Sequence, residues 1–430
     1  MSGVSSPSFR KLGLIFSFSM LIVCVGCGGG STSGSTPAPT ATPIPTPTPT
    51  PTPVPFAGVS LKVGDATVPR NGIFQYQLLL TEPKPIGNGS TRPSTPTGPV
   101  GPVRGVAIND VSGQAVGIAV INGSSISVSA KSPTGSFGTD ISYPLFTLTM
   151  PVNATATPGA TFPVDLDNAS ALFTDPTGVS YIKEIAGGTL TIAADGKQSI
   201  TDVIPGGGLL PDRTMLRVLG MNFTNNTRIS IEGTTVFFPA DTTFVNSNEI
   251  DVVICNGAAA ETATSCPSTG EKFQLDGERV RATNKDTNDV VEYFSYNRTT
   301  DDTTALPATG NALVAQVHPM FSRVTYTAGT IPFTHSGTQF TGIAFQNITP
   351  GPSTIKVELL DAASASLSSA SFTLLNGKRL ARDIADFFSA PPAGAVTVRA
   401  TVTAGSPIQM LGMLGDTSTG AVTPVVVTGQ

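Results

Sequence analysis

The chain has 430 residues, a net charge of −5 and only 12% charged residues, and it is rich in glycine (45) and proline (36). This composition favours β-sandwiches with many turns over long helices. Lys and Arg form no cluster in the sequence, which excludes nucleic-acid binding through a basic patch. Two histidines leave little room for histidine-based catalysis.

The first 26 residues are predicted to be an export signal. A short basic start with Arg10 and Lys11 precedes an apolar run over 12–26. A run of this length is typical of a signal peptide, since a membrane span needs about 20 residues. The end of the run, Cys24-Val25-Gly26-Cys27, resembles the lipobox of bacterial lipoproteins. The resemblance implies that Cys27 carries a lipid and becomes residue one of the mature chain. An ordinary signal peptide or a single membrane anchor is the alternative.

Residues 27–55 are predicted to be a disordered linker. The tract 28–34 contains Gly, Ser and Thr, and residues 37–55 hold nine prolines, mostly in a Thr-Pro repeat. Pro-rich chain extends at roughly 3.1 Å per residue, so this tract reaches roughly 60 Å. We expect it to hold the folded part away from a membrane of the cell envelope, facing outside the cytoplasm at the outer membrane or cell surface. The N-terminal lipid would be the only membrane contact.

Residues 56–194 are predicted to form a first β-sandwich. Apolar and polar residues alternate over 59–63 and 74–80, which indicates strands with one buried face. Residues 83–103 contain six prolines and are predicted to be a long loop. Further strand-like runs occupy 115–121, 125–130, 145–151, 161–166 and 189–192.

This segment resembles a cohesin domain. The sequence VSLKVGDATVPRNGIFQYQLLL at 59–80 is similar to the first two cohesin strands, PLFTLTMPVNATATPGATFPVDL at 144–166 to the central hairpin, and GGTLTI at 187–192 to the closing strand. The resemblance implies a sandwich that docks a partner protein. The loop 83–103 lies where cohesins carry a strand of their partner-binding face. Carbohydrate-binding modules share this kind of fold, so the resemblance also implies sugar binding.

Residues 198–298 resemble the IPT/TIG immunoglobulin-like domain. SITDVIPGGG at 199–208 and LRVLGMNFTNNTRISIEG at 216–233 carry the resemblance. Gly220 would permit a turn that a residue with a Cβ atom resists, and Phe223 would fill the sandwich core. The family implies an adhesive or spacer module.

Two cysteines fall in this second segment. Cys255 and Cys266 are an even pair in a chain predicted to be exported, so we expect a disulfide that closes the loop 256–265. A metal site is the alternative, but neither His nor further Cys flanks the pair.

Residues 312–430, after a polar linker at 299–310, are predicted to form a third sandwich. Its strand-like runs resemble immunoglobulin-like repeats of secreted bacterial proteins in their general pattern. Asn376-Gly377 indicates a tight turn. Leu380, Ile384 and Phe387 or Phe388 lie at helical spacing, which predicts a short helix.

The sequence offers no constellation for catalysis, and we predict no catalytic residue, no metal and no cofactor. A nucleophile elbow and a phosphate-binding loop are both missing from it. His318 and His335 are expected on the surface or in loops. Two groups of side chains are expected to serve turns, with a surface calcium as the alternative: Asp165, Asp167 and Asn168, and Asp286, Asn288 and Asp289.

The predicted function is non-catalytic binding of polysaccharide at the cell surface. A tether followed by strand-rich modules favours a binding protein over an enzyme. The chain has no Trp and six Tyr, and Tyr181, Tyr293, Tyr296 and Tyr326 are the candidates for exposed rings on which a sugar could stack. The alternatives are a docking scaffold of cohesin type for a surface or secreted protein, and a purely structural stalk.

Overall fold

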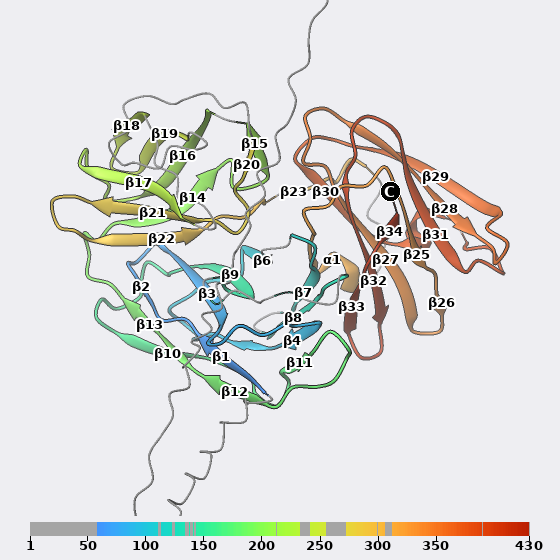
Figure 1. The fold of residues 1–430 in the computed structure, drawn as a ribbon, viewed down its shortest axis with the longest axis horizontal. Helices are drawn as coiled ribbons and strands as arrows, with labels where there is room; N and C mark the ends of the chain where they lie inside the picture. The colour runs from blue at the N-terminus through green and yellow to red at the C-terminus, as the bar shows by residue number, and fades with distance from the viewer. Residues whose placement is uncertain are drawn as a thin grey trace, which may run out of the picture. The chain divides into compact units, whose positions relative to one another are not determined.

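The computed structural model describes residues 58–429 except for 111–112, 123–124, 134–136, 138–140, 142, 212, 233–240, 255–271, 299, 306–311 and 389. The described residues fold into tandem β-sandwiches, which confirms the all-β class (Figure 1). No helix in this part of the chain is long and apolar enough to cross a membrane. Cys27, Cys255 and Cys266 lie outside the described residues, so lipidation and the disulfide stay predictions.

The first sandwich encloses one core between its sheets. One sheet has the order β12 (Lys183–Ala186), β1 (Val59–Val63), β3 (Ile73–Leu80), β9 (Phe146–Pro151) and β6 (Gly105–Ile108). Another has the order β11 (Leu172–Thr174), β4 (Asn88–Thr91), β8 (Ser125–Lys131), β7 (Val116–Asn122) and β24 (Val317–Met320). A third joins β2 (Ala66–Val68), β13 (Gly188–Ile192), β10 (Thr161–Leu166) and β5 (Pro93–Ser94). The core includes Phe74, Tyr76, Val128 and Phe173.

The structure confirms β1 and β3, the two strands that the alternating pattern of the sequence predicted. Their apolar residues are buried and the intervening residues are partly exposed, as a period of two requires. The prediction of an uninterrupted loop over 83–103 was wrong, because this stretch contains β4 and β5. β4 lies between Pro85 and Pro93, and β5 begins at Pro93. The proline signal therefore hid two short strands: β4 pairs with β8 and β11, and β5 pairs with β10.

The second sandwich has its own core around Phe223, which is 3% exposed, as predicted. Gly220 serves close packing, since a Cβ atom there would overlap the Phe223 ring and the Ser199 carbonyl oxygen. The left-handed turn residue is Asn222, at φ 56°. The strands form three groups: β14 (Ser199–Ile204), β16 (Thr214–Met221), β19 (Glu249–Ile254) and β18 (Asp241–Asn246); β17 (Thr227–Glu232), β21 (Arg279–Asn284) and β22 (Val290–Phe294); and β15 (Leu209–Pro211) with β20 (Lys272–Gln274).

The third sandwich packs two sheets around the Phe345, Phe372 and Phe387 rings. One sheet has the order β23 (Thr300–Asp301), β30 (Lys378–Asp383), β27 (Gln339–Gln346), β32 (Gln409–Asp416) and β33 (Ala421–Val425), and β26 (His335–Ser336) pairs with β27. The other has the order β29 (Ser366–Leu374), β28 (Ser353–Leu360), β31 (Thr397–Ala404), β25 (Ala328–Pro332) and β34 (Thr428–Gly429).

Two features of this segment differ from the sequence analysis. The predicted linker 299–310 contains β23, which pairs in parallel with β30. The predicted helix over 380–388 is a strand, β30, followed by one turn of 3-10 helix at Ile384–Phe387. Leu380 lies in the strand, while Ile384 and Phe387 are the buried residues of the turn. The helical spacing of the apolar residues was therefore misleading, because it runs from the end of a strand into a single turn.

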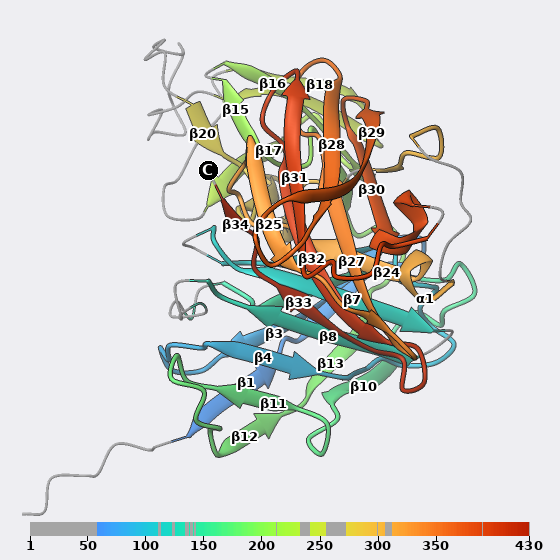
Figure 2. The same cartoon turned by 90° about the vertical axis from the view of Figure 1, so that its right-hand side faces the viewer.

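A strand from residues assigned to the third sandwich completes a sheet of the first. A short helix, α1 (Ala312–Ala315), leads into β24, which pairs antiparallel with β7 so that Val317 lies opposite Val120 and Met320 opposite Gly117. β24 occupies the edge of the sheet, a position that tolerates a proline such as Pro319. Figure 2 shows β24, β7 and β8 beside β32 and β33.

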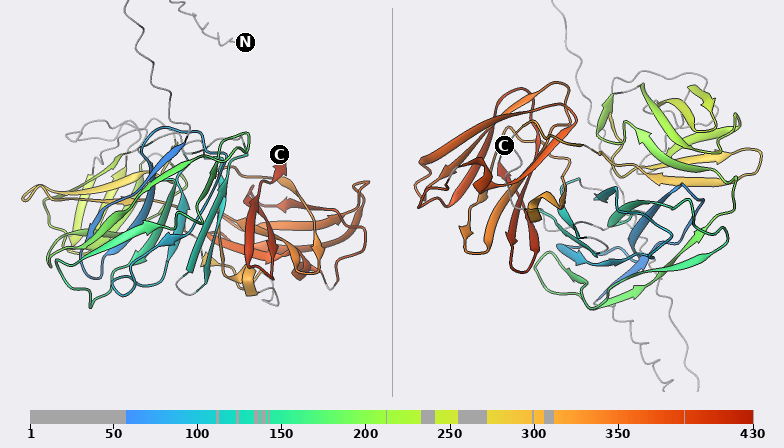
Figure 3. Two further views of the ribbon diagram at one scale, coloured as in Figure 1. Left: turned by 90° about the horizontal axis from the view of Figure 1, so that it is seen from below. Right: turned by 180° about the vertical axis from the view of Figure 1, so that it is seen from behind.

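The same region holds a hydrophobic cluster shared by the first and third sandwiches. It contains Val116 and Ile118 of β7, Val314 and Val317 of the connecting segment, Phe340 and Ala344 of β27, and Leu411 and Met413 of β32. All of these side chains are at most 3% exposed. The two sandwiches therefore bury one sheet face against another. Figure 3 shows the two sandwiches side by side.

We expect Ile118→Asp to lower the free energy of unfolding by roughly 3 kcal/mol or more, because an unpaired carboxylate in an apolar cluster loses its hydration. Urea unfolding measures this change. Leu367→Asp is the matched control, since Leu367 is 40% exposed on β29, and it should shift stability by about 0.5 kcal/mol or less. Equal effects of the two variants would contradict the burial of β7 beneath the third sandwich.

Candidate functional site

The outer face of the sheet β11-β4-β8-β7-β24 carries the candidate site. Its register places Leu172, Ser90, Ser129, Ile118 and Pro319 in one row across the strands. The neighbouring residues along β11, β8 and β7 belong to the core of the first sandwich, so this row points away from that core. At one end of the row the third sandwich covers Ile118. At the other end, Leu172 is 51% exposed.

Residues 172–182, which we call the apolar hairpin, extend this exposed end. An antiparallel bridge joins Thr174 to Ser180, and the Tyr181 N–H donates to the Phe173 carbonyl oxygen at 2.8 Å. This pairing places Ile182 opposite Leu172. Ile182 is 69% exposed and Val179, in the turn, is 64% exposed. The hairpin therefore presents three aliphatic side chains to solvent.

Hydrogen bonds hold the turn of the apolar hairpin in one conformation. Asp175 Oδ1 accepts from the Thr177 hydroxyl at 2.7 Å, from the Thr177 N–H at 2.8 Å and from the Val179 N–H at 2.9 Å. The Thr177 hydroxyl, followed by the Val179 N–H, holds the pKa of Asp175 below its usual value. The Tyr181 hydroxyl donates to the Pro85 carbonyl oxygen at 3.0 Å. The exposed aliphatic residues thus stand on an ordered support.

The first acidic group of the sequence serves a turn, as predicted. Asp165 Oδ1 accepts from the Leu166 N–H at 2.7 Å, and Asp167 Oδ1 accepts from the Ala169 N–H at 3.1 Å. The Ser170 hydroxyl lowers the pKa of Asp167. Within the described ranges, no group of His, Cys, Asp and Glu side chains could hold a metal ion.

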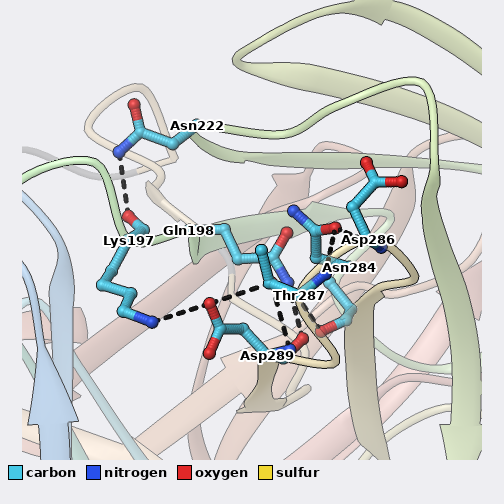
Figure 4. A network of polar contacts seen from close by, with 8 residues as sticks. Lys197, Gln198, Asn222, Asn284, Asp286, Thr287 and Asp289 are labelled. Atoms are coloured by element: carbon cyan, nitrogen blue, oxygen red, sulfur yellow. Dashed lines mark hydrogen bonds and ion pairs between the residues drawn. The ribbon is translucent and has the colours of Figure 1, made fainter.

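The second acidic group ties the start of the second sandwich to its β21–β22 turn (Figure 4). Lys197 Nζ lies 2.7 Å from Asp289 Oδ2 and lowers the pKa of that carboxyl. Gln198 Nε2 donates to the Asp289 carbonyl oxygen at 3.1 Å. Asn288 takes a left-handed conformation, at φ 58°, and the Asp286 N–H donates to Asn284 Oδ1 at 2.9 Å. This network is structural.

The tyrosines do not form a platform for sugar rings. Tyr293, Tyr296 and Tyr326 are 2%, 6% and 9% exposed, so a sugar ring cannot stack on them. Tyr181 is partly exposed, but its hydroxyl is bonded within the first sandwich. Among the described residues, Phe244 on β18, at 40%, is the only large aromatic side chain that is well exposed.

The histidines lie in strands and not in loops. His318 belongs to β24, and burial, with Arg379 nearby, lowers its pKa. His335 belongs to β26 and is exposed, with its ring centroid 6.5 Å from that of Phe333. Neither ring lies in the apolar hairpin.

Arg323 ties the three sandwiches together at a small cavity of about 80 Å³. Its N–H donates to the Gly113 carbonyl oxygen at 2.6 Å, and its Nη2 donates to the Asp276 carbonyl oxygen. Glu278 lies nearby, 7% exposed, with no hydrogen-bond partner for its Oε2 within the described part of the chain. Burial raises the pKa of Glu278 to about 7, although the positive charge of Arg323 opposes this shift.

We expect the free energy of unfolding to fall as pH rises from 4.5 to 7, because folded Glu278 keeps a proton that the unfolded chain releases. The contribution of one such group is at most about 1.4 kcal/mol per pH unit. Glu278→Gln should remove this part of the slope in urea unfolding measured from pH 4 to 8. The exposed control Glu82→Gln should keep it. An unchanged slope in Glu278→Gln would contradict the assignment.

Among the comparisons with known proteins, only the one with solved structures finds similar proteins. No protein-family model and no curated protein matches the chain. A non-cellulosomal cohesin from Archaeoglobus fulgidus is 18% identical, with 32% of this chain and 93% of that chain covered and a TM-score of 0.27. The third ScaB cohesin of R. flavefaciens, solved with a group 1 dockerin, is 19% identical, with 33% and 99% covered and a TM-score of 0.27. The third ScaC cohesin of Acetivibrio cellulolyticus, solved with the ScaB dockerin, is 14% identical, with 32% and 99% covered and a TM-score of 0.27. These neighbours are cohesin domains, but at such scores the similarity carries no argument about what this chain binds.

Proposed function

We propose that this chain is a non-catalytic protein of the cell envelope that docks a partner protein through the apolar hairpin of its first sandwich. The observation that supports the proposal is the exposure of Leu172, Val179 and Ile182 on an ordered hairpin. Exposed aliphatic side chains that stand together are typical of protein interfaces. The sequence resemblance to cohesins implies a docking role of the same kind.

The surroundings of the hairpin favour a protein partner over a polysaccharide. A sugar chain binds best to exposed aromatic faces, and the tyrosines are buried or engaged. Aliphatic residues gain instead from contact with another apolar protein surface. The sheet that ends at Leu172 already makes such a contact at its other end, where Ile118 is covered by the third sandwich.

We expect Leu172→Asp combined with Ile182→Asp to abolish recovery of a partner protein from the surface and secreted proteins of the same cell, because two carboxylates would be desolvated in the interface. Titration of the recovered, purified partner should show binding at least about tenfold weaker than to the unchanged chain.

The double variant Val290→Asp with Leu367→Asp is the control, since both residues are exposed on other sandwiches. Its binding should match that of the unchanged chain. Equal binding of the two double variants would contradict the proposed surface. Binding of a second copy alone, seen as a dimer by light scattering, would replace the partner with self-association, and the absence of any binding would favour a structural stalk.

The proposed location follows from the predicted lipid on Cys27 and the Thr/Pro-rich tract. We expect mass spectrometry of the mature protein to find a diacylglyceryl group on an N-terminal Cys27, and Cys27→Ser to lose it. Cys24→Leu, which introduces the residue that lipoboxes usually carry three positions before the lipidated cysteine, should keep the lipid. An unmodified N-terminus in the unchanged protein would contradict the anchor and leave the docking surface to be judged by the hairpin variants.

A further inference from the structure

A cleft of about 640 Å³ lies between the first and second sandwiches. This volume falls within the range of ligand sites, about 300 to 1,000 Å³, which often occur between domains. The first sandwich contributes the β2–β3 turn, the end of β9 and the residues before β6. The second sandwich contributes β14 and the chain after β22. The polar side chains that line it are Asn71, Arg104, Asn153, Thr201, Asp202 and Arg298.

A pair of hydrogen bonds fixes the two walls of the cleft relative to each other. Gln75 Nε2 donates to the Phe294 carbonyl oxygen at 2.9 Å, and the Phe294 N–H donates to Gln75 Oε1 at 2.8 Å. One amide side chain on β3 therefore binds the end of β22 as a neighbouring strand would. This two-point contact ties the two sandwiches together beside the cleft, to which β3 contributes Ile73.

Tyr296 contacts Arg298 and lies against Gly105, the residue that follows Arg104. The guanidinium carbon of Arg298 lies 5.7 Å from the centre of the Tyr296 ring, and Arg298 also forms an ion pair with Asp202. On the other side, Gly105 packs so closely that a Cβ atom would overlap the Tyr296 hydroxyl. Arg104 directly precedes this contact, and its N–H donates to the Thr149 carbonyl oxygen at 2.7 Å. The main chain at Arg104 is therefore held beside Tyr296, and the Arg298 guanidinium lies near the same ring.

The cleft carries an excess positive charge on a chain with a net charge of −5. Arg298 is balanced by Asp202, whereas exposed Arg104 has no ion-pair partner in the described part of the chain. A guanidinium binds a carboxylate through two parallel hydrogen bonds. Arg104 is thus available to an anionic group that enters the cleft.

The neutral polar groups decide what kind of anion fits. Asn71 is exposed, and Thr201 is partly exposed on β14. Asn153 donates through its Nδ2 to the Gly98 carbonyl oxygen, which leaves its Oδ1 to accept. One unbalanced cation beside three amide or hydroxyl side chains matches a ligand with one carboxylate among several hydroxyls. An acidic peptide would present more charges than this lining can pair.

We propose that the cleft binds an acidic saccharide of the uronic acid type. Arg104 pairs with the sugar carboxylate, while Asn71, Asn153 and Thr201 bond its hydroxyls. The site is separate from the apolar hairpin and needs no aromatic platform. Saccharide binding in the cleft is independent of the proposed partner docking, so the loss of one would leave the other intact.

Calorimetry of the full chain with a tetrasaccharide of three neutral sugars and one uronic acid residue tests the proposal. The matched neutral ligand is the same tetrasaccharide with its single carboxyl group methyl-esterified. We expect Arg104→Gln to weaken binding of the acid by about tenfold or more, as the loss of a charged hydrogen bond does. Arg213→Gln, an exposed arginine outside the cleft lining, is the control and should bind as the unchanged chain does. Thr201→Val should weaken both ligands severalfold.

Several results would overturn the proposal. They are no binding of the acid, equal binding of acid and ester, or unchanged binding by Arg104→Gln. Tight binding of poly-glutamate in place of the sugar would assign the cleft to acidic peptides. Matching thermal unfolding of Arg104→Gln and Arg213→Gln shows that a loss of binding is not a loss of fold.

Discussion

The pairing of β24 with β7, and the cluster beneath it, is the constraint on which the arrangement of the sandwiches depends. β7 presents Val116 and Ile118 on its outer side, while the outer side of neighbouring β8 carries serines such as Ser127 and Ser129. An apolar strand at a sheet edge would expose both unpaired main-chain groups and side chains. The chain covers both. Residues 317–320 pair with the main chain of β7, and the third sandwich packs on the outer side chains of β7.

This arrangement assigns different roles to the two ends of one sheet. The β7 end is covered by the third sandwich, whereas the β11 end, with the apolar hairpin, is exposed to solvent. The docking that we propose at the hairpin would therefore leave the contact between the first and third sandwiches undisturbed. The cleft between the first and second sandwiches is held by another contact, that of Gln75 with Phe294. The same packing that joins the sandwiches thus creates two surfaces with different chemistry.

Local patterns in the sequence predicted local structure well. The period of two identified β1 and β3, because a strand with one buried face alternates apolar and polar residues. The turn motif before Phe223 identified a core residue. The same reasoning could not find β24, since Val317-His318-Pro319-Met320 has no strand signal of its own and gains order by pairing with residues about 200 positions earlier. Exposure of Leu172 and Ile182, and burial of Tyr296, likewise depend on distant segments. The candidate surfaces therefore became visible only with the structure.

Native-state hydrogen exchange of the amides of Val120 and Val317 tests the interlocking of the sandwiches most directly. We expect these amides to exchange as slowly as those of β3 in the first core, because they open only when the sandwiches separate. Exchange as fast as that of the exposed edge strand β18, with β3 still protected, would contradict it.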